Sequence, residues 1–283
     1  MRRLIQILLL MAVATAGAGY TQENVGTTTG GPLLVKGVPI YGIADNGDLY
    51  WYLHRGYQNG TPDWANGGGR IKVGNGWNEG RFVFKGDPGG NDGVVYRIDS
   101  KGDLYWYKHL GFLSGSSQWL GGNKVGQGWQ DSRLVFSGGP GIVYRVDNQG
   151  DLYWYRHLGY ADGTARWSAA TKVGNGWSTA RFAFSEGSGI IYLIDQKGDL
   201  YWYRHLGYRT GAASWTDRKQ VGNGWTAAAS VLPGGDGRVY AMKRDGNLYW
   251  YRNTGFTTGT GTWAKSGAGE QIGTGWAEMV RMF

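Results

Sequence analysis

The sequence has 283 residues and a formal net charge of +8, with 53 Gly, 15 Trp, 19 Tyr and no Cys. The lack of cysteine excludes a scaffold stapled by disulfides. The Lys and Arg residues are spread along the chain instead of forming runs, which argues against a nucleic-acid-binding protein. A composition this rich in glycine and aromatic residues is typical of an all-β protein with many turns.

The first predicted element is a secretory signal peptide at residues 1–18. Two arginines precede an apolar run from Leu4 to Val13, and small residues suited to cleavage follow it. This run is too short to span a membrane. We therefore expect a secreted protein without membrane insertion, in which residues 19–37 form a flexible linker.

From residue 38 onward, three aromatic phrases recur five times and account for all the tryptophans. A Gly-Asp/Asn-Leu-Tyr-Trp phrase recurs at steps of 55, 48, 48 and 48 residues and supplies the cluster tryptophans Trp51, Trp106, Trp154, Trp202 and Trp250. A Val/Ile-Gly-x-Gly-Trp phrase supplies the GxGW tryptophans Trp77, Trp129, Trp177, Trp225 and Trp276. A single tryptophan follows each cluster tryptophan by 13 residues, at Trp64, Trp119, Trp167, Trp215 and Trp263. This periodicity predicts an array with repeats at about 38–77, 80–129, 132–177, 180–225 and 228–276.

One repeat contains four predicted strands separated by turn-forming segments. In the third copy these strands are Arg133–Phe136, Ile142–Val146, Leu152–His157 and a fourth around Arg166–Val173. Four short antiparallel strands repeated five times predict an all-β, five-bladed β-propeller that occupies residues 38–283. Because blades pack face to face, both sides of a strand are buried, which explains the unbroken aromatic clusters.

The two ends of the repeat region predict how the ring closes. The first copy lacks a first strand of its own, whereas residues 279–283 have the pattern of a first strand without a blade. We expect this C-terminal strand to complete the first blade and remove the open edges. Leu33–Val35 is a competing candidate for the same place.

The polar residues that catalysis or metal binding would need are copied around the ring instead of being concentrated in one repeat. The turn aspartates Asp48, Asp103, Asp151 and Asp199 share one repeat position, and so do the histidines His54, His109, His157 and His205. Such residues lie on different blades and do not converge as a carboxylate pair or a metal site. We expect no catalytic residue, no metal and no cofactor, and histidines that serve as structural hydrogen-bonding groups.

The repeated GxGW loops are the best candidates for a binding site. Each places a short polar side chain between two glycines and before a tryptophan, at Asn75, Gln127, Asn175, Asn223 and Thr274. Amides supply paired donors and acceptors, and an indole offers an apolar surface for the C–H face of a sugar. In the alternative interpretation, the glycines only turn the chain and the tryptophan fills a gap between blades.

The GxGW phrase, an Arg-Phe-x-Phe strand, the Gly-x-Leu-Tyr turn and the single tryptophan together resemble the tachylectin-2 family. This resemblance covers about residues 40–283 and implies a five-bladed propeller lectin that binds N-acetylglucosamine or N-acetylgalactosamine between blades. The family's phrase generally has a second glycine before its tryptophan, which this chain lacks.

We therefore predict a secreted, monomeric and multivalent lectin, specific for N-acetylhexosamine-type sugars. The expected contacts are the polar residue and tryptophan of each GxGW loop, helped by the five single tryptophans. Divergence of the fifth copy at Asn247, Asn253 and Thr274 predicts that its site is altered. The alternatives are a protein-binding propeller scaffold and a glycoside-active enzyme, and the latter would need an asymmetric pocket.

Overall fold

The computed structural model describes residues 36–283, and they form five four-stranded antiparallel sheets. Blade 1 contains β20 (Met279–Met282), β1 (Val38–Ala44), β2 (Leu49–His54) and β3 (Ile71–Gly74). Blade 2 contains β4 (Gly80–Lys85), β5 (Val94–Asp99), β6 (Leu104–His109) and β7 (Trp119–Gly126). Blade 3 contains β8 (Ser132–Gly139), β9 (Ile142–Asp147), β10 (Leu152–Arg156) and β11 (Thr171–Gly174).

The two remaining blades have the same strand order. Blade 4 contains β12 (Ala180–Gly187), β13 (Ile190–Asp195), β14 (Leu200–Arg204) and β15 (Lys219–Gly222). Blade 5 contains β16 (Ala228–Gly235), β17 (Arg238–Lys243), β18 (Leu248–Arg252) and β19 (Glu270–Gly273). Short 3-10 turns lie at Ala65–Gly68, Trp77–Glu79, Trp177–Thr179, Trp225–Ala227, Ala264–Gly267 and Trp276–Glu278.

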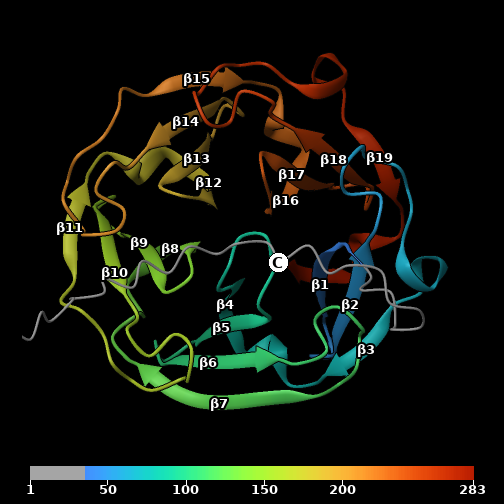
Figure 1. Ribbon diagram of the computed structural model, residues 1–283, viewed down its shortest axis with the longest axis horizontal. Helices are drawn as coiled ribbons and strands as arrows, with labels where there is room; N and C mark the ends of the chain where they lie inside the picture. Colours follow the sequence, from blue (N-terminus) through green and yellow to red (C-terminus); the bar gives the residue numbers. More distant parts are fainter. Residues whose placement is uncertain (1–35) are drawn as a thin grey trace, which may run out of the picture. The chain divides into compact units, whose positions relative to one another are not determined.

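These sheets surround a central axis, with the first strand of each blade innermost and the fourth outermost (Figure 1). The predicted five-bladed propeller is thus confirmed. The signal peptide and residues 19–35 of the predicted linker lie outside the described residues. No helix within residues 36–283 combines the length and the apolar character needed to cross a bilayer.

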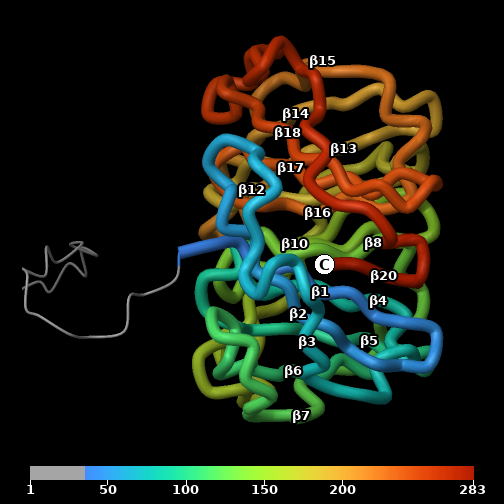
Figure 2. The backbone as a smooth tube through the Cα atoms, turned by 90° about the vertical axis from the view of Figure 1, so that its right-hand side faces the viewer, coloured from blue at the N-terminus to red at the C-terminus, as the bar shows by residue number. Residues whose placement is uncertain are grey.

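Closure of the ring by the C-terminal strand is also confirmed. Strand β20 pairs with β1 through Gly42 and Met282, and the two strands lie together in the side view (Figure 2). The backbone N–H of Tyr41 donates to the carbonyl of Phe283 at 2.8 Å, and the aromatic rings of these residues stack with centroids 5.0 Å apart. The place for which Leu33–Val35 would compete is therefore occupied, while those residues lie outside the described part.

The fourth strand of the third repeat begins later than predicted, at Thr171 instead of near Arg166. Trp167 meets its neighbouring strand only through an isolated bridge to His157. The ladder between β10 and β11 ends at the pair Trp154 and Thr171, so it covers only the end of the predicted segment, and its register shifts between Leu152 and Tyr153. An aromatic pattern alone does not reveal such a bulge.

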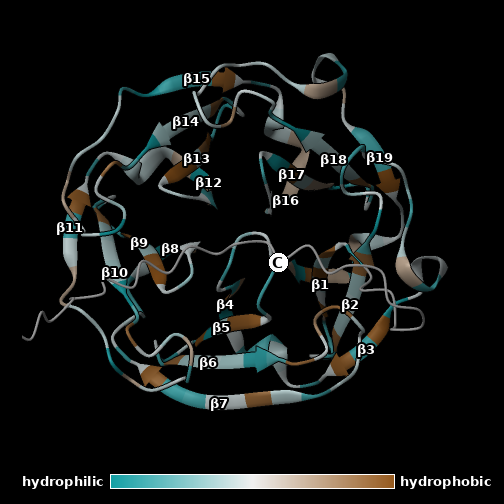
Figure 3. Ribbon diagram, viewed as in Figure 1, coloured by the Kyte–Doolittle hydropathy of each residue, from teal (hydrophilic) through white to brown (hydrophobic). Residues whose placement is uncertain are grey.

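The core lies between blades, and the hydrophobic residues fall mainly within strands such as β5 and β13 (Figure 3). Every cluster tryptophan lies opposite the tyrosine of its second strand, as Trp154 does opposite Tyr144. Trp154 is 3% exposed and donates its indole N–H to the carbonyl of Tyr208 in the next blade at 2.8 Å. Gly211 has a φ of +80°, and a Cβ there would lie 2.6 Å from the Trp154 ring, so only glycine permits this contact.

The predicted structural role of the histidines is confirmed in four blades. His157 contacts the hydroxyl of Tyr96 in the preceding blade through Nδ1 at 2.6 Å and the carbonyl of Thr164 through Nε2 at 2.8 Å. A carbonyl only accepts hydrogen bonds, so Nε2 carries the proton and Nδ1 accepts one from the tyrosine. Burial lowers the pKa of all four histidines, which keeps them neutral; they are His54, His109, His157 and His205.

Candidate grooves between the blades

The GxGW loops and the Asp-Gly turns lie on the same face of the ring. In the third repeat, the backbone N–H of Trp177 donates to the carbonyl of Gly150 at 2.9 Å. The same bond joins loop and turn in the other four repeats, with distances from 3.0 to 3.1 Å. This bond fixes each loop to the rim of its blade, where the loop faces the next blade.

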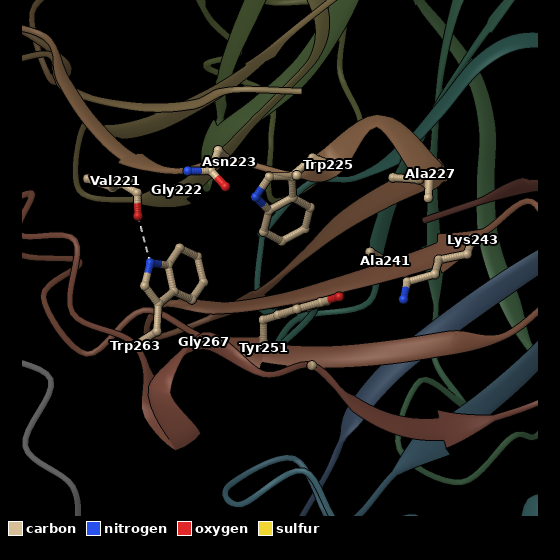
Figure 4. A pocket seen from close by; sticks show the side chains of 13 residues that line it. Val221, Gly222, Asn223, Trp225, Ala227, Ala241, Lys243, Tyr251, Trp263 and Gly267 are labelled. Carbon is tan, nitrogen blue, oxygen red and sulfur yellow. Dashed lines mark hydrogen bonds between the residues drawn. The ribbon is translucent and has the colours of Figure 1, made fainter. Parts of the chain in front are cut away.

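Each GxGW tryptophan packs against a tyrosine and a single tryptophan of the following blade. The Trp225 ring centroid lies 4.8 Å from that of Tyr251 and 6.1 Å from that of Trp263 (Figure 4). Equivalent trios occupy the other four interfaces: Trp77 with Tyr107 and Trp119, Trp129 with Tyr155 and Trp167, Trp177 with Tyr203 and Trp215, and Trp276 with Tyr52 and Trp64. The predicted binding residues therefore converge across the blade boundary.

Two glycines shape each loop for different reasons. A Cβ at Gly222 would lie 3.4 Å from the Trp225 indole nitrogen, and one at Gly273 only 2.6 Å from that of Trp276. The second glycine, such as Gly224 with a φ of +82°, requires a left-handed backbone and faces open space. The loop thus turns sharply and leaves its outer side accessible.

The three sets of tryptophans differ in what their indole N–H groups bind. Single tryptophans donate to the carbonyl that precedes each GxGW phrase, as Trp263 does to Val221 at 2.7 Å, and this bond holds adjacent blades together. Cluster tryptophans also donate to backbone carbonyls. Within residues 36–283, the GxGW tryptophans donate their indole N–H to no protein acceptor.

The polar residues of the GxGW loops are exposed: Asn75, Gln127, Asn175, Asn223 and Thr274. Their side chains form no hydrogen bond with any other described residue. Each groove therefore presents an unused amide or hydroxyl close to an unused indole N–H. The tryptophan of each GxGW phrase fills the interface between blades, as the structural interpretation expects, while its indole nitrogen has no acceptor among residues 36–283.

The interfaces between blades 4 and 5 and between blades 5 and 1 each contain a cavity of this kind. The 4/5 groove has a volume of about 390 Å³ and is lined by Asn223, Trp225, Tyr251 and Trp263, among others. The 5/1 groove has a volume of about 450 Å³ and is lined by Thr274, Trp276, Tyr52 and Trp64. Both volumes fall within the range of about 300–1,000 Å³ that is typical of ligand pockets.

Two sequence differences open these grooves. Blades 1 and 5 each carry three more residues than the other blades between the single tryptophan and the GxGW tryptophan, and the added 3-10 turns provide Gly67 and Gly267 as walls. In the 4/5 groove, Ala241 stands where blade 2 has Arg97. The Arg97 guanidinium donates to the carbonyl of Gly76 at 3.1 Å and fills the corresponding space.

Sequence reasoning missed the groove tyrosines, such as Tyr251 and Tyr52, although they directly follow the cluster tryptophans. Burial raises the pKa of Tyr251, and that of Tyr52 to about 12, so both hydroxyls stay protonated. The turn aspartates do not converge; Asp48, Asp103 and Asp151 each form an ion pair with a lysine of the same blade. Residues 36–283 contain no group of three or more His, Asp or Glu side chains placed to hold a metal.

A sequence profile of the Tachylectin family matches residues 33–182 and 160–283. The chain belongs to the Tachylectin family. This membership supports a lectin-type propeller, as the resemblance implied. A comparison with curated proteins gives no match.

Comparison with solved structures gives similar chains of low sequence identity. One of them, described as "The de novo evolutionary emergence of a symmetrical protein is shaped by folding constraints", has a TM-score of 0.57 and 18% identity over 87% of this chain and 97% of its own. Prp20p from Saccharomyces cerevisiae has a TM-score of 0.40 and 11% identity over 83% of this chain, which spans 61% of that protein. At 18% identity, the likeness to the first of these structures is one of fold alone.

Proposed function

We propose that this Tachylectin-family protein is a secreted lectin that binds N-acetylhexosamine-type sugars in the grooves between its blades. The observation that carries the proposal is the fivefold set of indole N–H groups that have no protein acceptor within residues 36–283, each beside an exposed amide or hydroxyl. Sugar hydroxyl and acetamido groups need such neutral donors and acceptors. The adjacent aromatic rings offer an apolar surface to the C–H face of a pyranose.

Repetition of similar grooves favours multivalent binding. One groove offers few polar contacts and is expected to bind a free sugar weakly. On a surface with clustered glycans, linked sites raise the overall affinity by ~10²–10⁴ without new contacts. This arrangement suits recognition of a glycan-coated surface by a monomer, with no enzymatic step.

A glycan array followed by titration calorimetry with free N-acetylglucosamine tests the proposal. We expect array binding that free sugar competes away, and a stoichiometry that falls by one site in Trp225→Phe, which removes a free N–H but keeps an aromatic ring. Trp202→Phe is the matched control, because its N–H binds the carbonyl of Phe256 at 2.7 Å, away from the GxGW loops. It should lower stability and leave the stoichiometry unchanged.

A blank array and a flat titration at high protein concentration would refute the lectin proposal. The protein-binding scaffold would then become the better hypothesis.

A further inference from the structure

We propose that the 4/5 groove is specialised for anionic glycans, with a carboxylate or sulfate group bound at Lys243 and at the cations beyond it. This inference rests on the proposed function, since it concerns the ligand of one of the same grooves. It is carried by the charges that line the 4/5 groove and the two cavities beside it.

Lys243 lies at the end of the 4/5 groove opposite Trp263 (Figure 4). The corresponding residues of blades 2, 3 and 4 are Asp99, Asp147 and Asp195, so the charge is reversed in blade 5 alone. Those aspartates accept hydrogen bonds from the backbone N–H groups of their turns.

In blade 5 the turn is supported by Asp245 instead, whose carboxylate accepts a hydrogen bond from the backbone N–H of Asn247 at 3.0 Å. Lys243 is thereby released from that task. Its ammonium lies 3.7 Å from the centre of the Tyr249 ring, and no carboxylate of the described residues lies within ion-pair distance of it. The chain thus holds a lysine without a counter-charge at the end of the groove.

The positive charge continues beyond Lys243 into two further cavities. One, of about 560 Å³, lies over the start of the inner strands and is lined by Arg81, Lys243, Arg244 and Arg281. Another, of about 340 Å³, is lined by Arg181 and Arg244. Together with the groove, these cavities share lining residues and contain five basic side chains and no acidic one.

Two of the basic side chains are held in place by backbone carbonyls, which do not neutralise them. Arg81 donates to the carbonyl of Ser132 at 2.7 Å, and Arg181 donates to that of Thr226 at 3.0 Å. None of the five basic side chains takes part in an ion pair among residues 36–283. Burial and the neighbouring charge of Arg244 lower the pKa of Arg181, as expected where like charges lie close together without an anion.

The neighbouring 5/1 groove lacks this character, because its arginine, Arg70, forms an ion pair with Glu278 across the cavity. A carboxylate or sulfate ester that projects from a sugar in the 4/5 groove would instead meet donors that form charge-assisted hydrogen bonds. Two grooves of similar shape thus differ in the charge of the ligand that they favour.

Calorimetric titration of the full chain with three probes tests the proposal: N-acetylglucosamine, its 6-sulfate, and N-acetylneuraminic acid. We expect at least one anionic probe to occupy one site about tenfold more tightly than the neutral sugar, as one added charge-assisted bond provides. This preference should shrink as the salt concentration rises. The two anionic probes distinguish sulfate from carboxylate as the group that is recognised.

Lys243→Asp places in blade 5 the residue found in blades 2–4, so the fold should tolerate it. We expect this variant to lose the preference for the anionic probe, so that the neutral and anionic sugars bind with similar affinity. Lys197→Asp, on the exposed turn of blade 4, is the control with the same charge change and should retain the preference.

Equal affinity for neutral and anionic probes, or a preference that survives Lys243→Asp, would overturn the anionic inference while the lectin function stands. A lack of binding to all three probes would overturn both proposals.

Discussion

Replacing Asn253 by histidine should stabilise the protein, because blade 5 lacks a hydrogen bond that the other four blades possess. In those blades the Tyr–His bond between neighbours measures 2.6 to 2.9 Å. Asn253 is fully buried and donates to the carbonyl of Thr260 at 3.2 Å, which reproduces the outer contact of the histidines. Its shorter side chain does not reach Tyr192, so the Tyr192 hydroxyl and the Asn253 carbonyl oxygen are both buried without a partner.

The size of the effect follows from these two unsatisfied atoms. A buried polar group without a partner costs about 1–3 kcal/mol, and a formed hydrogen bond contributes about 0.5–1.5 kcal/mol. Asn253→His removes one unsatisfied atom and gives the other a partner, so we expect the free energy of unfolding to rise by at least about 2 kcal/mol. For a domain of this size, each kcal/mol corresponds to a melting-temperature rise of about 2–4 °C.

Urea unfolding of a double-mutant cycle measures the new bond directly. Tyr192→Phe should by itself stabilise the natural protein by about 1 kcal/mol, because the hydroxyl it removes is buried without a partner. In the Tyr192→Phe background, Asn253→His should bring no further gain, because its ring nitrogen has no hydroxyl to bind. Tyr144→Phe is the matched control and should cost about 1 kcal/mol, since it breaks an existing bond to His205. A gain from Asn253→His that persists in the Tyr192→Phe background, or no gain at all, would refute the reasoning.

Three further predictions concern pH, the loop glycines and ring closure. Burial lowers the pKa of His54 from 6.5 to about 4, so the unfolded chain binds more protons than the folded chain between these pH values. Urea unfolding at a series of pH values should show that the free energy of unfolding falls by about 3 kcal/mol as the pH falls from 6.5 to 4. Burial raises the pKa of Glu186 from 4.5 to about 8, so its contribution is lost as the pH rises through that range, and the same titrations should show no such decline in Glu186→Gln. Gly273→Ala should displace Trp276 and abolish sugar binding in the 5/1 groove, whereas Gly222→Ala, where the added Cβ has 0.8 Å more room, should retain more binding in the 4/5 groove. Calorimetric titration measures both variants, and an equal loss of sugar binding would contradict this reasoning. Deleting residues 279–283 should destabilise the protein by several kcal/mol in urea unfolding, because β1 loses its partner and Tyr41 its stacked ring; an unchanged midpoint would disprove the role of β20.

Much of the fold could be predicted because the same local sequence pattern recurs in all five repeats. The constant interval between Tyr144 and Trp154 reflects strands that lie opposite each other, and the pattern of residues 279–283 revealed the closing strand. The late start of β11 could not be predicted, because the sequence pattern does not show that the ladder ends at Trp154 and Thr171 and leaves Trp167 with only an isolated bridge to His157.

The repeat positions predicted which residues belong to the candidate site, but not which residues of neighbouring blades contact one another there. Trp225 and Trp263 belong to neighbouring blades, and repeat spacing does not show which faces meet across a boundary. For the same reason, sequence reasoning did not separate the available N–H of Trp225 from that of Trp263, which the carbonyl of Val221 occupies. The added residues before β19 resemble those before β3, and comparison of the intervals in blades 1 and 5 would have exposed the two wider grooves.

Completion of the first blade by β20 imposes an order on biosynthesis. Of the described strands, β1 is translated first and its partner β20 last. Tyr41 and Phe283 are about 240 residues apart in the sequence, and closing a loop of this length costs about 5 kcal/mol in chain entropy. Until β20 leaves the ribosome, the backbone of β1 is an open edge that invites pairing with other chains. Closure of the ring is therefore a late and slow step in folding. Where nascent chains are crowded, pairing of β20 with β1 of the same chain competes with domain swapping, in which β20 pairs with β1 of a neighbouring chain.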